Sequence, residues 1–210
     1  DGKKIVIGNL RMEPLLLGLA VVYDRLIVDF ESVAKVGDPM DDRGDYRYWE
    51  PGRFTGQYKE FTQDVDLYAF GVILYRQTHQ GKFPYTGDTK EAYAAAVAKG
   101  EYTISQNLSP ELAAILSLIL NADRNMRPTS TDLISIFGSI LTKKLMTPLS
   151  NAITINNKAD LPSELLNQID PKIKDEFMKL IESLKANKID RHSDDESQTH
   201  IGLWIVAILV

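Results

Sequence analysis

Two short stretches near the start of the chain carry the residues whose types and spacing could do chemistry. They read IGNLRMEPLLL at residues 7–17 and VDFESVAK at residues 28–35. Proton transfer and metal binding need basic or ionised side chains, and Asp29 is such a group. The amide of Asn9 has no usable basicity near neutral pH, and Pro14 offers no side-chain oxygen. Any reaction here would have to rely on Asp29 and on nearby carboxylates such as Glu13 or Asp24.

These stretches resemble, position by position, the catalytic loop H-R-D-L-K-P-E-N-L-L-L and the D-F-G motif of protein kinases. On this alignment Asn9 stands at the catalytic base, Pro14 at a metal-binding Asn, and Asp29 at the residual metal position. Gly8 replaces the Arg of H-R-D, and Glu31 replaces the Gly of D-F-G. In the family the loop Asp accepts the substrate proton, and the Asn and the D-F-G Asp hold two magnesium ions. The resemblance therefore implies a kinase-like chain that is catalytically inactive, as pseudokinases are.

Later stretches follow in the order typical of serine/threonine kinases. They are GDYRYWEPGRF at 44–54, DVDLYAFGVILY at 64–75, GKFPY at 81–85, GEY at 100–102 and NADRNMRPT at 121–129. They resemble the end of the activation segment, the core helix, a following turn, a loop after the next helix, and the D-P-x-x-R-P-T motif. One short motif means little alone, but five in one order extend the resemblance over residues 5–141.

Three residues are expected to support this structure rather than to react. Asp66 lies in a segment that is apolar on several sides, so we expect its carboxylate to be buried and bonded. By resemblance it would accept backbone N–H groups of the catalytic loop. The alternative is that an Asp caps the helix start, with Asp64 as the candidate.

Arg127 is expected, by resemblance, to pair with the Glu that closes the activation segment. Gly52 stands at that position, so Glu50, two residues upstream, is the expected substitute partner. A buried charge left alone would cost about 3–5 kcal/mol. The open alternative is an exposed, unpaired Arg127.

The fold expected over residues 1–145 is an α+β, protein-kinase-like large (C-terminal) lobe. It should be mainly helical, with a small β-hairpin at residues 15–30. Neither G-x-G-x-x-G nor a V-A-I-K-like strand occurs, so the N-terminal lobe is expected to be absent from the chain. Glu31 to Gln63 is expected to be an exposed activation segment. Ser109-Pro110-Glu111 predicts a helix start, and Leu133, Ile136, Phe137 and Ile140 a buried helical stripe.

Beyond the lobe, residues 146–190 are expected to form a linker and an extra amphipathic helix. Its apolar side is formed by Ile173, Phe177, Leu180, Ile181 and Leu184. Lys172 is expected to face Glu176, and the helix to pack back on the lobe rather than to bind a partner. Residues 191–210 form a polar linker and an apolar end, Ile201 to Val210. Ten apolar residues are too few to span a bilayer, so this end is either the start of a span or a docking segment.

Composition limits the partners. The chain has 24 basic and 29 acidic residues, a net charge of -5, and no Lys/Arg block, so nucleic acid is not an expected partner. It has no cysteine, which excludes disulfides and fits a cytoplasmic location. The histidines lack metal-ligand spacing, so we expect no metal site and place His79, His192 and His200 in exposed loops.

The leading functional hypothesis is an inactive kinase-like domain that acts on a protein partner as a scaffold or allosteric regulator. No cofactor is expected, with weak binding of ATP and magnesium as the alternative. A second hypothesis is an active serine/threonine kinase whose N-terminal lobe lies outside this chain. A third is a membrane-tethered sensor held by the C-terminal apolar segment.

Overall fold

The structure is a computed structural model that describes residues 5–6, 33–143 and 147–186. The positions of Gly8, Asn9, Pro14 and Asp29 lie outside the described residues, as do the hairpin predicted at 15–30 and the apolar segment 201–210. The elements, in chain order, are β1 (Ile5–Val6), β2 (Ala34–Lys35), η3 (Tyr46–Tyr48), α2 (Pro51–Phe54), α3 (Gln63–Thr78), α4 (Lys90–Lys99), β3 (Glu101–Ile104), α5 (Pro110–Ile119), η4 (Arg124–Met126), α6 (Ser130–Lys143), β4 (Ile153–Asn156), α7 (Ser163–Gln168) and α8 (Pro171–Ala186). The mainly helical architecture with small antiparallel sheets confirms the predicted fold class.

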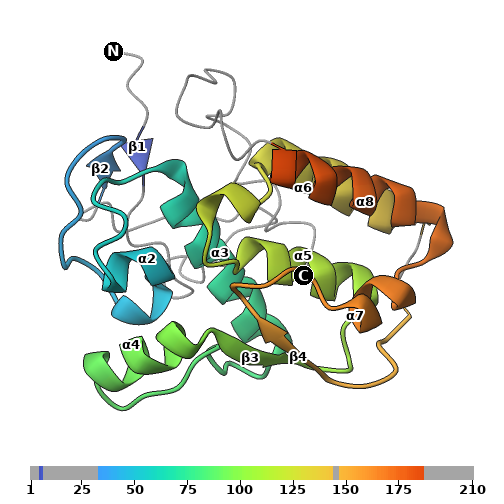
Figure 1. Cartoon of the computed structure of the whole chain (residues 1–210), viewed down its shortest axis with the longest axis horizontal. Helices are drawn as coiled ribbons and strands as arrows, with labels where there is room; N and C mark the ends of the chain where they lie inside the picture. Colours follow the sequence, from blue (N-terminus) through green and yellow to red (C-terminus); the bar gives the residue numbers. More distant parts are fainter. Residues whose placement is uncertain (1–4, 7–32, 144–146, 187–210) are drawn as a thin grey trace, which may run out of the picture.

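Helices α3 and α5 form the centre of the molecule and contact one another (Figure 1). Both are apolar around most of their circumference, which is the pattern of a helix enclosed by protein rather than one lying at a surface. Gly71 allows their close approach, because a Cβ at this position would lie 2.5 Å from Cγ2 of Ile119. The remaining helices pack around this pair.

Strands β1 and β2 join chain segments on either side of residues 7–32. They pair antiparallel, with Ile5 opposite Lys35 and Val6 opposite Ala34. Ala34 in turn packs on Phe61 and Val65 in a small buried cluster. The chain before the first candidate stretch is therefore fixed to the start of the activation segment.

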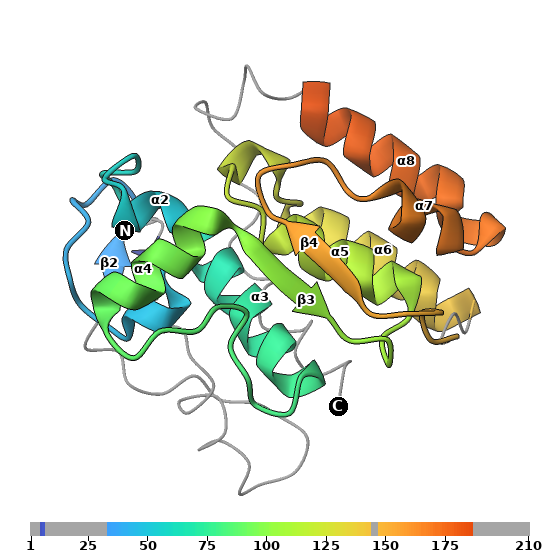
Figure 2. The ribbon, with the colours of Figure 1, turned by 60° about the horizontal axis from the view of Figure 1, so that its bottom comes forward.

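Strands β3 and β4 correct two predictions. The expected loop at 100–102 begins β3, and the expected linker after residue 145 contains β4, which pairs antiparallel with β3 from Glu101↔Asn156 to Ile104↔Ile153 (Figure 2). Buried and exposed residues alternate along both strands, so each buries one face against the helices. The alternation spans only four residues in each strand, which is too short a signal to recognise without its partner.

The extra helix α8 packs back on the lobe, as predicted. Its apolar stripe is buried, with Ile173 and Phe177 fully inaccessible, and the helix lies along α6. Leu180 is only partly buried. The expected contact between Lys172 and Glu176 is replaced by an ion pair of Glu176 with Lys143 of α6, at 2.5 Å.

Two predicted helices are confirmed and one histidine is corrected. Ser109 caps α5, its hydroxyl accepting the N–H of Leu112 at 3.3 Å, and the stripe predicted for α6 is buried. His79 is not in an exposed loop. It follows the last residue of α3, and its ring stacks on Tyr75 with a centroid separation of 3.8 Å.

Candidate functional site

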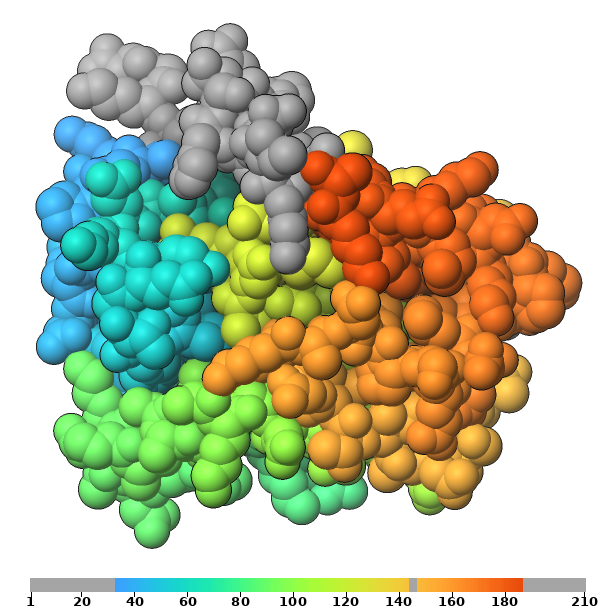
Figure 3. All heavy atoms as spheres, viewed as in Figure 1, coloured from blue at the N-terminus to red at the C-terminus, as the bar shows by residue number. Residues whose placement is uncertain are grey.

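The described part of the candidate site is where the activation segment meets the stretch 121–129. In the space-filling view the yellow-green region around residues 121–129 reaches the surface between the blue and cyan activation segment and the orange and red residues 147–186 (Figure 3). The segment is less exposed than predicted, because Tyr48, Trp49, Glu50 and Phe61 are all buried. Its two ends are held together by backbone hydrogen bonds between residues 37–40 and 59–61.

Glu50 lies between two arginines at the centre of this contact. Its Oε2 atom is 2.7 Å from Nη1 of Arg127, and both side chains are completely buried. The Nε atom of Arg124 donates to the same oxygen at 2.9 Å, and its Nη2 pairs with Oε1. Arg127 also donates from Nε to the carbonyl of Asn121 at 2.9 Å and from Nη1 to that of Asp64 at 3.2 Å. One carboxylate thus joins the activation segment to the 121–129 stretch.

The electrostatics of this cluster favour the charged forms. Burial alone would raise the pKa of Glu50, but the charges and hydrogen bonds of Arg127 and Arg124 outweigh it and lower that pKa. Burial would lower the pKa of Arg127, but the carboxylate of Glu50 outweighs it and raises that pKa. The structure therefore brings together Glu50 and Arg127, and the alternative of an exposed Arg127 is wrong.

Gly52, at the position where the resemblance places a Glu, is covered by an aromatic ring. A Cβ at Gly52 would lie 2.1 Å from Cδ2 of Tyr58. The Tyr58 hydroxyl accepts the N–H of Arg124 at 3.2 Å and donates to the carbonyl of Ala122 at 3.4 Å. The guanidinium of Arg124 lies 3.8 Å from the centroid of the same ring. Sequence reasoning missed Tyr58. The signal for it was Gly52, because a glycine in place of the expected Glu leaves space that another side chain must fill.

Asp66 does not lie as deep as predicted. It is half-buried in the first turn of α3, where the helix has Thr62, and not Asp64, as its N-cap residue. Asp64 lies inside the helix and accepts a hydrogen bond from Oγ1 of Thr62 at 3.2 Å. The loop residues that Asp66 is expected to bind lie outside the described part of the chain, so its role remains a prediction.

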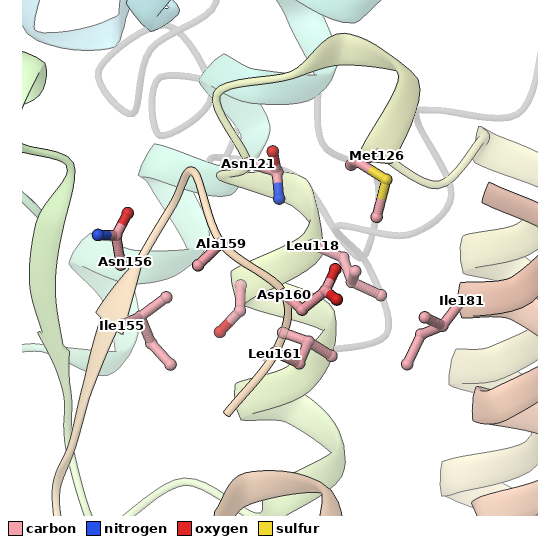
Figure 4. Close-up of a pocket in the computed structure, with 10 residues that line it drawn as sticks. Leu118, Asn121, Met126, Ile155, Asn156, Ala159, Asp160, Leu161 and Ile181 are labelled. Atoms are coloured by element: carbon pink, nitrogen blue, oxygen red, sulfur yellow. The ribbon is translucent and has the colours of Figure 1, made fainter. Parts of the chain in front are cut away.

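A small cavity lies between α5, the 155–161 stretch and α8 (Figure 4). Its interior of about 10 Å³ holds about one water molecule. An adjoining surface hollow of about 360 Å³ is lined by Asn121, Asp123, Met126, Lys158, Ala159, Asp160 and Lys185. Within residues 5–6, 33–143 and 147–186, no group of three His, Asp or Glu side chains is placed to hold a metal ion.

Comparison with known proteins gives a family match. The sequence model of the family described as protein tyrosine and serine/threonine kinase matches residues 49–137, a range that does not include Asn9, Pro14 or Asp29. Sperm motility kinase Z of Mus musculus is 34% identical over 126 residues, which are 60% of this chain and 24% of that protein. Serine/threonine-protein kinase PLK1 of Xenopus laevis is 36% identical over 73 residues, 34% of this chain and 12% of that protein.

A solved structure is also similar. The kinase PK-1 of Cydia pomonella granulovirus matches with a TM-score of 0.49 and 19% identity, over 59% of this chain and 46% of that one. The alignment with the mouse kinase covers about a quarter of its length, and the alignment with the frog kinase about an eighth.

Proposed function

We propose that this chain, which belongs to the protein kinase superfamily, is the large lobe of a catalytically inactive kinase-like domain that acts by binding, as a scaffold or regulatory partner. The observation that carries the proposal is the pair of substitutions at the two reactive positions. Asn9 cannot accept a substrate proton, and Pro14 cannot coordinate magnesium. Gly8 changes the same catalytic loop and Glu31 changes the D-F-G motif, so a single compensating residue would not restore both functions.

The described scaffold supports a role in binding. Glu50 and Arg127 form a fully buried ion pair, and the helices around it keep a continuous apolar core. Isolated buried ion pairs are weak stabilisers compared with apolar packing, so this pair serves to fix the position of the activation segment. A lobe with an ordered surface and substituted reactive positions is suited to recognising another protein. Nucleic acid is a poor candidate partner at a net charge of -5.

A phosphate-transfer assay on the full-length protein that contains this chain tests the proposal. With magnesium and ATP we expect no transfer above background. The informative variant is the double substitution Asn9→Asp with Pro14→Asn, which restores the proton acceptor and the metal ligand of the family motif. Transfer by the unmodified protein that is abolished by Asp29→Ala would overturn the proposal.

The alternative function is an active serine/threonine kinase that uses Asp29 and a carboxylate such as Glu13 or Asp24, with its small lobe outside this chain. The retained Asp29, and Arg11 in the basic position of the loop, favour this alternative. Nucleotide binding gives a second measurement. A ligand present at 100 times its dissociation constant stabilises the folded state by about 2.7 kcal/mol. A pure scaffold should show no change in unfolding temperature with ATP and magnesium.

We place the domain in the cytoplasm, with attachment to a membrane through Ile201 to Val210 as part of the proposal. Among the helices of residues 33–143 and 147–186, none is both long and apolar enough to cross a bilayer. The apolar end is ten residues, about half of a span. Fractionation of cells that express the full-length protein, with and without residues 201–210, tests the attachment. Equal recovery of both forms in the soluble fraction would exclude it.

A further inference from the structure

The side chain of Arg53 is buried in the activation segment, and its ion-pair partner there is a carboxylate that is not buried. Only 4% of its side chain is exposed, and the nearest carboxylate oxygen that pairs with it, Oδ1 of Asp41, is 3.9 Å away on a residue that is itself 42% exposed. Arginine is almost never buried unless its guanidinium is paired or hydrogen-bonded. The position of Arg53 therefore needs another explanation.

The guanidinium of Arg53 binds backbone carbonyls across the segment. Nε donates to the carbonyl of Asp41 at 3.1 Å, and Nη2 donates to the carbonyls of Asp41 and Arg43. These acceptors lie 10 and 12 residues earlier in the chain. Because only the planar fork of arginine offers several donors in fixed directions, one side chain here connects the two halves of the segment.

Trp49 completes the arrangement. Its ring centroid lies 3.9 Å from the guanidinium carbon of Arg53, within the range of a cation–π contact. The indole Nε1 of Trp49 donates to the carbonyl of Arg43 at 3.2 Å, so Trp49 and Arg53 bind the same backbone oxygen. Lys90, at the start of α4, lies 4.4 Å from the same ring. The contacts connect residues 41–53 to each other and to the helical lobe.

The arrangement is not fully satisfied. Nη1 of Arg53 is buried without an acceptor among the described residues. Burial lowers the pKa of Arg53 to about 10, against the opposing charges of Asp41, Glu50 and Asp42. Arg53 is still charged at neutral pH, so its carbonyl contacts are charge-assisted and strong.

We propose that Arg53 is an internal clamp that holds residues 38–49 in one ordered conformation, so that this segment is ordered without an added phosphate. The guanidinium of Arg53 supplies, within the segment, the cation and the several donors needed to join its two halves. This inference goes beyond the proposed function, because it holds whether or not the domain transfers phosphate.

Amide hydrogen exchange of the full-length protein tests the clamp. The informative amides are those of Met40, which donates to the carbonyl of Lys59, and of Tyr48 and Trp49, which donate to carbonyls within residues 38–49. We expect Arg53→Gln, and also Arg53→Lys, to speed their exchange about tenfold or more, the size that follows from losing a charge-assisted hydrogen bond. Exchange in α5 should not change. Unchanged exchange of the segment, or an equal increase in α5, would overturn the proposal.

Arg43→Gln is the matched control. Arg43 belongs to the same segment and pairs with the same Asp41, but its side chain is 38% exposed and its pair is at the surface. We expect the exchange rates of the segment to stay at the level of the unmodified protein. An effect as large as that of Arg53→Gln would show that any cation in the segment serves, and would overturn the specific role of Arg53.

Two further measurements do not depend on exchange rates. In the 210-residue chain with Trp204→Phe, which leaves Trp49 as its single tryptophan, Arg53→Lys should increase quenching of the fluorescence by acrylamide. Phosphatase treatment of the unmodified protein should leave exchange of residues 38–49 unchanged. Faster exchange after phosphatase treatment, or unchanged quenching in Arg53→Lys, would contradict the proposal.

Discussion

Glu50 Oε2 lies 2.7 Å from Nη1 of Arg127, 77 residues later in the chain, and neither side chain is accessible to solvent. Arg124 binds the same carboxylate from the other side. The carboxylate comes from the residue before Pro51, whereas the family motif supplies it from the residue after that proline, where this chain has Gly52. The ion pair is therefore formed from a position two residues upstream in the chain, and Tyr58 fills the space that the missing side chain leaves.

Glu50→Gln should strongly destabilise the domain. The variant removes the negative charge that pairs with Arg127 at this site, and leaving one buried charge without its partner costs about 3–5 kcal/mol. Urea unfolding followed by circular dichroism measures the loss. Asp160→Asn is the control, because it breaks an exposed pair with Lys185 and should cost about 0–1 kcal/mol. A loss below 1 kcal/mol for Glu50→Gln would mean that the arginines find other acceptors.

Gly52→Ala should destabilise the domain, although it adds a single methyl group. The new Cβ would overlap the ring of Tyr58, and overpacking of this kind typically costs about 1–3 kcal/mol. Gly138→Ala in α6 is the matched control, because nothing lies within 4 Å of its Cβ and alanine favours a helix over glycine by about 1 kcal/mol. The two substitutions should therefore shift the urea midpoint in opposite directions.

A double substitution checks the cause of the Gly52→Ala loss. Tyr58→Ala removes the ring that the methyl group meets, so the two changes together should cost less than the sum of the separate costs. Additive losses would mean that the methyl group disturbs the backbone of α2 and not the ring.

The stability of the domain should fall as the pH is lowered below about 6.5, in part through His79. Nε2 of His79 accepts the N–H of Ser105 at 2.9 Å, so the neutral ring carries its proton on Nδ1, next to the carbonyl of Tyr75. Burial lowers the pKa of His79 below its ordinary value of 6.5, with a smaller contribution from Lys82. The unfolded chain therefore takes up this proton at a higher pH than the folded chain. The contribution of the neutral ring is complete above pH 6.5 and is lost as the pH falls toward the lowered pKa.

His79→Gln tests this pH dependence. The free energy of unfolding, measured between pH 5 and pH 8, should fall less steeply for the variant than for the unmodified protein. His192 and His200 are present in both proteins, so the difference in slope belongs to His79. Parallel curves would show that its protonation is not linked to folding.

Phe177→Ala should destabilise the whole lobe and not only α8. Phe177 is completely buried in the main core, and truncation of such a side chain costs about 3–5 kcal/mol. Lys179→Ala, on the exposed side of the same helix, should change the stability by less than about 0.5 kcal/mol. Both values come from urea unfolding.

The cooperativity of unfolding shows whether residues 147–186 are part of the lobe. In the Trp204→Phe background, the fluorescence of Trp49 and the exchange of α8 amides should report one transition with the same midpoint. Early unfolding of α8 in the unmodified protein would show instead that residues 147–186 form a separate unit.

The sequence by itself indicated the resemblance to protein kinases and the helical elements that local patterns encode. Ser109 with Pro110 marked the start of α5, and apolar residues at helical spacing marked the buried faces of α6 and α8. Such signals depend on residues within one or two turns of each other, so a single sequence contains them. The substitutions at Asn9 and Pro14 are likewise read directly from the motif.

Tertiary structure decided the contacts between residues far apart in the chain. Three contacts follow from how the elements pack. Tyr58 covers Gly52, Arg53 binds the carbonyls of Asp41 and Arg43, and Ile104 pairs with Ile153. The sequence predicted that Glu50 pairs with Arg127. It did not predict that Arg124 also binds the carboxylate of Glu50. A short strand or a single side chain has many acceptable partners locally, and only the shape and charge of the assembled core select one.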